Sequence, residues 1–141
     1  MPESINLIDS TATEKFGAEL WARLPEKALI FLHGDLGAGK TTLVRGLLRA
    51  AGVTGTIKSP TYAVIEEYSV VERKIFHFDL YRLTDAEELE WIGIDDYLNQ
   101  NALCFVEWAN KGKGVLPKAD VNIYLTTQND GRLLEIDGMF F

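Results

Sequence analysis

The strongest constraint on this chain is a glycine-rich turn that lies between two apolar segments. The turn reads Gly34-Asp35-Leu36-Gly37-Ala38-Gly39-Lys40-Thr41 and matches the pattern G-x-x-x-x-G-K-[ST]. The apolar run at 28–33 before it predicts a buried strand, and leucines at helical spacing after it predict a helix from Thr42 to about Ala51. A strand, a glycine turn and a helix in this order are the context in which the pattern forms a phosphate-binding loop.

The residue types in this turn suit the binding of a nucleotide phosphate. Glycines let the backbone fold tightly with its N–H groups pointing inward, where the positive end of the following helix also attracts phosphate oxygens. Lys40 would reach the β- and γ-phosphates, and the Thr41 hydroxyl would bind Mg²⁺. The residues expected to contact the nucleotide are Asp35, Leu36, Gly37, Ala38, Gly39, Lys40, Thr41 and Thr42.

Composition describes one globular domain with an acidic surface. The chain has 141 residues, of which 47% are hydrophobic and 25% charged, and its net charge is −7. A chain that binds nucleic acid by itself normally has a basic surface, so direct tight binding of RNA or DNA is disfavoured. The apolar runs are too short to span a bilayer, and the first residues lack the features of a secretory signal. The single cysteine, Cys104, predicts a small buried thiol in a reducing compartment such as the cytoplasm.

The hydrophobic pattern predicts an α/β fold, a single domain in which helices flank a mixed central sheet. Only Glu72 and Arg73 separate two strand-like segments, and so short a link joins antiparallel but not parallel strands. Helices are expected to start at Ser10 or Thr11, with a capping box at 11–14, and at a second capping box at 84–87. Strands are expected at 4–9, 28–33, 61–71, 74–81, 102–106, 121–127 and 132–136, the last two as a hairpin across 129–131.

Two carboxylates at the ends of apolar strands are candidates for the magnesium site of a phosphate loop. Asp79 follows the run at 75–78, and Glu107 follows the run at 103–106. Each carboxylate has an alternative role as a helix cap or the partner of a surface lysine. His77 shares a strand face with Asp79 and is interpreted as a satisfied core residue. Arg82 is either a cation at the site or part of a surface ion pair.

Two polar segments are each open to two interpretations. The segment 56–62, with Ser59, Pro60 and Thr61, is either an ordinary connection or a mobile loop that faces the γ-phosphate and senses the nucleotide. Ser10 and Thr11 are either helix caps or neighbours of the base and ribose.

Four motifs in order resemble the TsaE (YjeE) family of small bacterial P-loop ATPases, over essentially the whole chain. They are Gly-Asp-Leu-Gly-Ala-Gly-Lys-Thr-Thr at 34–42, Ser-Pro-Thr-Tyr at 59–62, His-Phe-Asp-Leu-Tyr-Arg at 77–82 and Phe-Val-Glu-Trp at 105–108. The resemblance implies a P-loop NTPase-like domain, ATP and Mg²⁺ as cofactors, and a role in making threonylcarbamoyladenosine beside the tRNA anticodon. It also implies two partner proteins, a transferase-like subunit and its non-catalytic relative, with tRNA contacted only indirectly.

The same resemblance implies roles for single residues. Lys40, Asp79 and Glu107 would be catalytic, and Lys40 with the loop backbone would bind phosphates. Thr41 and Glu107 would be the magnesium ligands. Asp79 would position water or lie in the outer coordination sphere of the metal. Residues 59–61 would form the switch-like segment. ATP hydrolysis is expected to be weak in the isolated protein and effective in a complex with partners.

Three other classes compete with this interpretation. A GTPase is disfavoured because Asn110-Lys111-Gly112-Lys113 lacks the carboxylate that would accept from guanine N–H groups. A small-molecule kinase would need an acceptor pocket and usually an arginine-rich lid, and no insertion of that size stands out. A non-enzymatic module in which ATP merely orders a docking surface remains an alternative.

Overall fold

A computed structural model describes residues 3–35, 37–60, 64–71 and 73–138 of the chain. In chain order the elements are β1 (Glu3–Leu7), α1 (Ser10–Arg23), β2 (Ala28–His33), α2 (Lys40–Ala51), β3 (Ile65–Val70), β4 (Arg73–Asp79), α3 (Glu88–Trp91), α4 (Ile94–Leu98), β5 (Ala102–Glu107), the 3₁₀ helix η1 (Ala109–Gly112), β6 (Val121–Gln128) and β7 (Gly131–Gly138).

Within the described residues, seven strands form one mixed sheet in the order β1-β7-β6-β2-β5-β4-β3. The central strands β6, β2, β5 and β4 are parallel to their neighbours in this group. Antiparallel pairs lie at both edges, β6 with β7 and β7 with β1 on one side, and β3 with β4 on the other. The mixed sheet expected from the short link at 72–73 is therefore confirmed, and Val70 pairs with Arg73 across that link.

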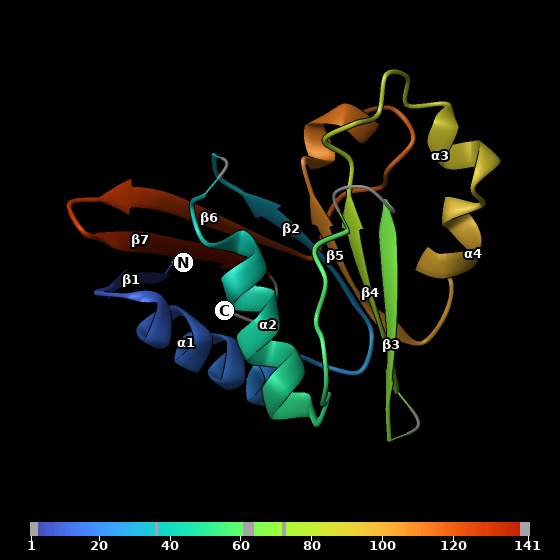
Figure 1. Cartoon of the computed structure of the whole chain (residues 1–141). Helices are drawn as coiled ribbons and strands as arrows, with labels where there is room; N and C mark the ends of the chain where they lie inside the picture. Colours follow the sequence, from blue (N-terminus) through green and yellow to red (C-terminus); the bar gives the residue numbers. More distant parts are fainter. Residues whose placement is uncertain (1–2, 36, 61–63, 72, 139–141) are drawn as a thin grey trace.

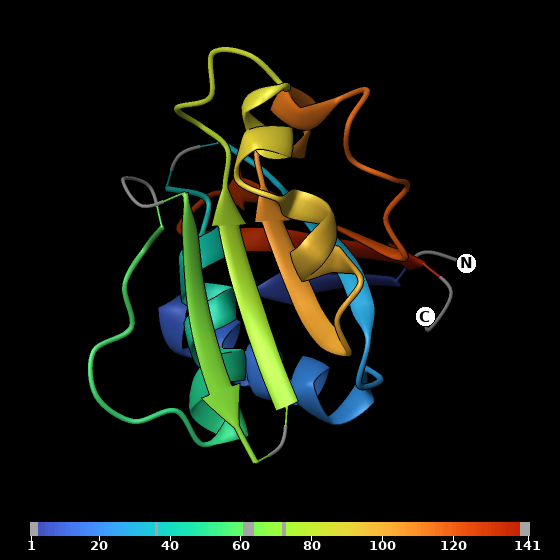
Figure 2. The same ribbon diagram turned by 90° about the vertical axis from the view of Figure 1, so that its right-hand side faces the viewer.

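Helices cover both faces of the sheet (Figures 1 and 2). The long helices α1 and α2 lie on one face, over a core cluster that includes Leu20, Ile30 and Leu47. The short helices α3 and α4 lie on the other face over β4 and β5, around Phe76 and Phe78. Buried residues alternate between the two clusters along β4 and β5, as expected for strands that are covered on both faces.

Helices α1 and α2 cross at close range because glycines lie at the crossing. A Cβ atom at Gly46 would lie 2.1 Å from the carbonyl oxygen of Glu14, and one at Gly17 would lie 2.3 Å from that of Leu43. Both distances are far shorter than any van der Waals contact, so the helices can approach this closely only without side chains there. The close packing fixes α2, and therefore Lys40 in its first turn, relative to the rest of the domain.

Helix α1 begins at Ser10, one of the two predicted starts, but its capping residue differs from the predicted one. The N-cap is Asp9, whose Oδ1 accepts a hydrogen bond of 2.8 Å from the backbone N–H of Ala12. The predicted capping box at 11–14 is wrong, because Thr11 is already inside the helix. The alternating sequence pattern predicts Asp9 in the preceding strand, but that strand ends at Leu7.

The second predicted capping box is wrong by one residue. Backbone N–H groups of Thr84 and Asp85 donate to Oε2 of Glu88, at 2.9 Å and 3.2 Å, rather than to Glu87. The segment before Glu88 forms turns, so the helix α3 begins later than the sequence pattern suggests. Gly93 separates α3 from α4 in the left-handed conformation that glycine favours.

The other predicted elements are confirmed with small shifts in their ends. The last hairpin turns at Asn129-Asp130, because Gln128 pairs with Gly131. The strand predicted at 61–71 is described at Ile65–Val70, and its first residues lie outside the described part of the chain. Cys104 is a buried free thiol, and burial raises its pKa to about 12. Within the described ranges, no helix has the length and apolar character needed to cross a membrane.

Candidate functional site

A cleft of about 340 Å³ opens where the parallel strands β4 and β5 end. Lys40, Asp79 and Glu107 line it together with Thr41, and the start of α1 and the turn between β6 and β7 form its other walls. Ligands of open α/β sheets bind outside the carboxyl ends of the parallel strands, so the cleft lies where such a fold binds them. Of the two residues considered as base or ribose neighbours, Ser10 is in the lining and Thr11 is not.

The glycine-rich loop has a backbone that only glycine adopts readily. Gly37 and Gly39 have φ angles of 81° and 103°, in the left-handed region. A Cβ atom at Gly34 would lie 2.6 Å from the carbonyl oxygen of Leu125, so the loop also needs glycine for its close approach to β6. Helix α2 starts directly at Lys40, which aims its N-terminal N–H groups toward the cleft. Leu36 lies outside the described residues.

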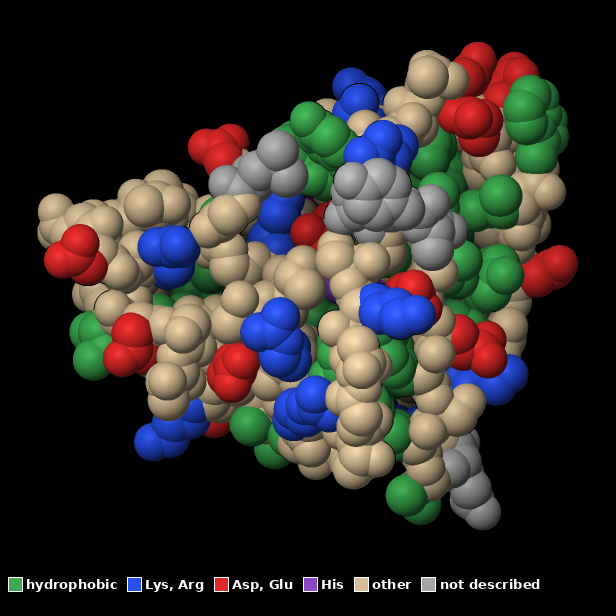
Figure 3. All heavy atoms as spheres, in the orientation of Figure 1, with side chains coloured by type: hydrophobic (Ala, Val, Ile, Leu, Met, Phe, Trp, Pro, Cys, Tyr) green, Lys and Arg blue, Asp and Glu red, His purple; other side chains and the backbone are tan. Residues whose placement is uncertain are grey.

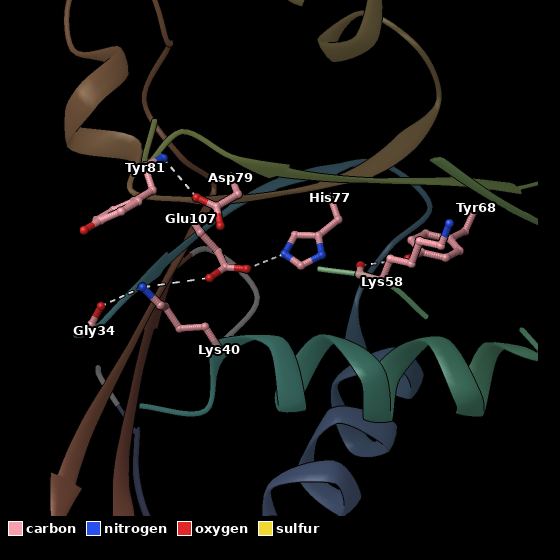
Figure 4. A network of polar contacts seen from close by, with 8 residues as sticks. All are labelled: Gly34, Lys40, Lys58, Tyr68, His77, Asp79, Tyr81 and Glu107. Atoms are coloured by element: carbon pink, nitrogen blue, oxygen red, sulfur yellow. Dashed lines mark hydrogen bonds and ion pairs between the residues drawn. The ribbon is translucent and has the colours of Figure 1, made fainter. Parts of the chain in front are cut away.

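Lys40 is nearly enclosed, with 5% of its surface exposed. Its Nζ donates to the carbonyl oxygen of Gly34 at 2.7 Å and lies 3.9 Å from Oε1 of Glu107 (Figure 4). Burial lowers the pKa of Lys40 from 10.5, although the nearby carboxylates of Glu107 and Asp79 oppose the shift. The ammonium group is therefore held at the base of the cleft in surroundings where a further anionic group would stabilise it.

Asp79 and Glu107 lie directly opposite each other on β4 and β5, and each is 4% exposed. Their carboxylates are turned to different partners. Oδ1 of Asp79 accepts from the backbone N–H of Tyr81 at 2.9 Å, and Oε2 of Glu107 contacts Nε2 of His77 at 2.6 Å. The structure thus brings both predicted strand-end carboxylates into the cleft beside Lys40.

His77 is completely buried on β4, as expected for a core residue. Its hydrogen bonding differs from that expectation. Nε2 bonds to Glu107, while Nδ1 has no hydrogen-bond partner among the described residues. The histidine therefore contacts a cleft carboxylate instead of being satisfied within the core.

Trp108 lies beside Lys40 in a strained backbone conformation. It has a φ angle of 58°, which is unusual for a bulky residue, and its ring centroid lies 4.3 Å from Nζ of Lys40. The ring also packs against Tyr81, with centroids 5.1 Å apart. Strained backbone of this kind concentrates at functional sites, and here it directs an aromatic face toward the loop lysine.

Arg132 is a cleft residue that the sequence reasoning missed. It lies in β7 and donates through Nε and Nη2 to the carbonyl oxygens of Ala38 and Gly37, at 3.0 Å and 2.9 Å. Arg82, the arginine considered from the sequence, is exposed and is not among the described residues that line the cleft. Arg132 is the arginine in that lining. No sequence motif surrounds Arg132, and only the return of the last hairpin to the loop indicates its place.

Ser59 lines the cleft, as the switch-like interpretation of the segment 56–62 requires. The loop before it is attached to β3, since the hydroxyl of Tyr68 donates to the carbonyl oxygen of Lys58 at 3.3 Å. Thr61 and Tyr62 of the same segment lie outside the described residues.

The donor set fits a nucleotide that carries Mg²⁺. Thr41 supplies a hydroxyl oxygen, Glu107 and Asp79 supply carboxylates, and Lys40 and the loop supply donors for phosphate oxygens. No group of three or more His, Cys, Asp or Glu side chains suited to a metal ion occurs in the described ranges. Magnesium in proteins is often bound through one or two carboxylates plus substrate phosphates, so a metal here would depend on the nucleotide.

Comparison with known proteins identifies the family. Residues 7–134 match the family model described as "Threonylcarbamoyl adenosine biosynthesis protein TsaE". The chain belongs to the TsaE family. The matched range includes every described residue that lines the cleft, from Asp9 to Arg132.

Individual relatives agree with the TsaE assignment. A protein of Haemophilus influenzae named "tRNA threonylcarbamoyladenosine biosynthesis protein TsaE" is 49% identical over 124 residues, which are 87% of this chain and 78% of the relative. A Synechocystis protein of the same name is 43% identical over 111 residues, 74% of this chain and 69% of the relative. The crystal structure of Bacillus subtilis YdiB superposes with a TM-score of 0.81 at 26% identity, covering 96% of this chain and 84% of YdiB.

Proposed function

We propose that this chain binds ATP with Mg²⁺, hydrolyses it, and thereby supports threonylcarbamoyladenosine modification of tRNA beside the anticodon. The observation that carries the proposal is the buried contact between Lys40 of the glycine-rich loop and Glu107 at the end of β5, 3.9 Å apart. A phosphate loop and a strand-end carboxylate converge in this way in nucleotide hydrolases. The names of the TsaE relatives connect the chain to the tRNA modification.

Phosphate recognition is assigned to the loop and the first turn of α2. The backbone of residues 35–42, together with Lys40, would surround the phosphate oxygens, and Lys40 would exchange its bond to the Gly34 carbonyl for the β- and γ-phosphates. Burial lowers the pKa of Lys40 and so destabilises its charged form in the free protein. A phosphate next to the ammonium group would stabilise the charged form again, which favours the exchange.

Thr41 and Glu107 would hold the magnesium ion, whose chemistry is to neutralise the charge that develops on the transferred phosphoryl group. Asp79 would orient the attacking water. It lies beside Glu107 at the C-terminal end of β4, and its carboxylate accepts a hydrogen bond from the backbone N–H of Tyr81. A buried carboxylate held in one orientation beside the reacting groups can act as the general base that positions a water molecule.

The isolated chain is proposed to be a slow ATPase. Among the described residues that line the cleft, the cations are Arg132, which is bonded to loop carbonyls, and Lys40, which would meet the phosphates. Phosphoryl transfer depends on stabilising developing charge, and an arginine from a partner can increase the rate by ~10³–10⁵. The proposed partners are a transferase-like subunit and its non-catalytic relative.

The surface over α3 and α4 supports binding to proteins rather than directly to tRNA. Figure 3 shows acidic side chains gathered beside a hydrophobic one at this end of the molecule. The exposed acids are Asp85, Glu87, Glu90, Asp95 and Asp96. Trp91 is 78% exposed among them, and tryptophan is favoured at the centre of protein interfaces. Phosphate backbones would be repelled here, so tRNA contact is assigned to a partner.

The direct test measures ATP hydrolysis by the purified chain, alone and after adding the two partner proteins. The proposal expects slow hydrolysis alone, a rate increase in the mixture, and co-elution of the three proteins in the presence of ATP. Two results together would contradict the partner-dependent activity. The isolated chain would show high turnover that does not change when the partners are added, and the proteins would not co-elute.

Two alternatives are separated by the fate of the nucleotide. A small-molecule kinase would transfer the γ-phosphate to a metabolite, so the proposal expects inorganic phosphate as the product instead. A non-hydrolysing sensor would support modification equally well with ATP and with a non-hydrolysable analogue. The proposal expects the analogue to allow complex formation but not continued modification in a reconstituted assay.

A further inference from the structure

We propose that His77 is a positioning residue that fixes the Glu107 carboxylate, so that one oxygen is held by the imidazole while the other faces Lys40 and the glycine-rich loop. The proposal rests on the proposed function of the cleft, because it concerns how Glu107 would receive the magnesium ion of the nucleotide. It assigns a role to a residue that would otherwise count as part of the core.

The geometry of the two strands creates this contact. Glu107 pairs with Asp79 across β4 and β5, whereas His77 pairs with Phe105, so His77 and Glu107 are diagonal neighbours on one face of the sheet. Glu107 leans toward His77, and its Oε2 lies 2.6 Å from Nε2 (Figure 4). The other oxygen, Oε1, faces Nζ of Lys40 at 3.9 Å. Each oxygen of the carboxylate therefore has its own partner.

Core packing alone does not explain a histidine at this position. The side chain is fully buried, and Nδ1 lacks a hydrogen-bond partner among the described residues. A buried polar atom without a partner costs stability, so an apolar residue of similar size would serve the core better. Among the described residues, the hydrogen-bond partner of the ring is Glu107, which points to that bond as the reason for the histidine.

Direct catalysis does not explain it either. His77 is 0% exposed and is not among the described residues that line the cleft. It cannot reach a water molecule or a phosphate from that position, and any influence on the reaction must pass through Glu107.

The two partners of Glu107 then have different roles. Lys40 is the exchangeable partner, because a bound phosphate would draw its ammonium toward the nucleotide. His77 is the fixed partner, since its ring is fully buried and is hydrogen-bonded to Glu107. When Lys40 turns to the phosphates, His77 keeps the freed Oε1 pointing at the place where the metal would bind.

The experiment compares His77→Leu, which removes the donor, with His77→Gln, whose terminal amide can donate near the position of Nε2. Binding of an ATP analogue is measured by calorimetry with Mg²⁺ and in excess chelator. His77→Leu is expected to weaken binding about tenfold with Mg²⁺ and to leave binding in chelator unchanged, a size typical of one hydrogen bond to a charged group. His77→Gln is expected to restore most of the loss.

A double-mutant cycle with Glu107→Gln separates positioning from a structural role. If His77 acts through the carboxylate, His77→Leu has no further effect on binding in the Glu107→Gln background. A loss of the same size in both backgrounds, or an equal loss with and without Mg²⁺, would overturn the proposal. His33→Leu is the matched control, because His33 bonds to Asn122 and is not in the described lining of the cleft. The His33→Leu protein should bind the ATP analogue as tightly as the unchanged chain does.

The failure of this inference is distinguishable from failure of the proposed function. If the unchanged chain binds the analogue with Mg²⁺ and His77→Leu binds it equally well, only the positioning role is overturned. If the unchanged chain binds no nucleotide, the proposed function is overturned and the positioning role with it. Thermal unfolding of each variant shows that the compared proteins are folded.

Discussion

Arg132 donates through Nη2 to the carbonyl oxygen of Gly37 at 2.9 Å, although 95 positions separate the two residues. The same guanidinium donates through Nε to the carbonyl oxygen of Ala38 at 3.0 Å. The last hairpin of the chain thus holds the loop by its carbonyl groups. A trans peptide points its C=O and N–H groups in opposite directions, so fixing the Ala38 carbonyl also fixes the N–H of Gly39, a residue that lines the cleft. The N–H of Ala38 is used within the loop, where it donates to the carbonyl oxygen of Asp35 at 3.0 Å.

Removing the bonds from Arg132 to the loop carbonyls should weaken nucleotide binding without unfolding the protein. Arg132→Met retains the length of the side chain but loses the two charge-assisted hydrogen bonds to the loop, and we expect about a tenfold loss of ATP affinity. Calorimetric titration measures the loss. Arg49→Met is the matched control, because Arg49 also donates to a backbone carbonyl, that of Val53, at the far end of α2. Equal effects of the two substitutions would contradict a specific role for Arg132.

Lys40→Ala should remove most nucleotide affinity. The lysine supplies a positive charge at the base of the cleft that no neutral side chain replaces, and we expect a loss of roughly 10- to 100-fold from one interaction with a charged group. Fluorescence titration is a suitable measurement, because Trp108 lies 4.3 Å from the lysine. Lys15→Ala on the exposed surface of α1 is the control. An unchanged affinity in Lys40→Ala would contradict the phosphate-loop assignment.

ATP affinity should also fall as pH rises. The fall should begin at a lower pH than the titration of an ordinary lysine would produce. Burial lowers the pKa of Lys40 from 10.5, so the free protein begins to lose the ammonium charge earlier. A bound phosphate raises that pKa again, and binding above the lowered value must therefore take up a proton and weaken with pH. The measurement is affinity against pH for the unchanged chain and for Lys40→Arg, whose charge persists. The same decline in both would show that another group titrates.

The two carboxylates should separate binding from turnover. If Glu107 binds the metal directly, Glu107→Gln weakens Mg²⁺-dependent nucleotide binding by about tenfold or more. If Asp79 orients water, Asp79→Asn leaves binding nearly unchanged but lowers the single-turnover rate by ~10²-fold or more, as expected for a lost general base. Binding and single-turnover hydrolysis are measured on both variants. The reverse pattern would mean that the roles of Asp79 and Glu107 are exchanged.

The parts of the site that sequence could predict are those whose residues are close together or end a regular element. The glycine loop is a contiguous pattern, and Asp79 and Glu107 were found because acids after apolar strands stand out. Asp9 was missed because an alternating pattern extended the strand over it, and only the cap geometry shows its role. Arg132 and the bond of His77 to Glu107 depend on strand order and register, which no local pattern contains.

The close crossing of α1 and α2 gives a prediction in which two effects oppose each other. Gly46 lies inside α2, and replacing a helical glycine by alanine would ordinarily stabilise a helix by about 1 kcal/mol. Here the new Cβ would lie 2.1 Å from the carbonyl oxygen of Glu14, so the helices would have to move apart. Forcing extra volume into a packed core costs about 1–3 kcal/mol or more, and contact with backbone places this site at the upper end.

We therefore expect Gly46→Ala to lower the free energy of unfolding by about 1–3 kcal/mol, because the overpacking cost exceeds the gain in helix propensity. Denaturant unfolding followed by circular dichroism measures it. Separation of the helices would also displace Lys40, since α2 begins at that residue, so ATP affinity should fall in the same variant. Ala50→Gly near the exposed end of α2 is the control, which should lose stability by about 1 kcal/mol but keep its ATP affinity. A Gly46→Ala protein with raised stability would show that the crossing tolerates a side chain and that the position of α2 does not depend on it.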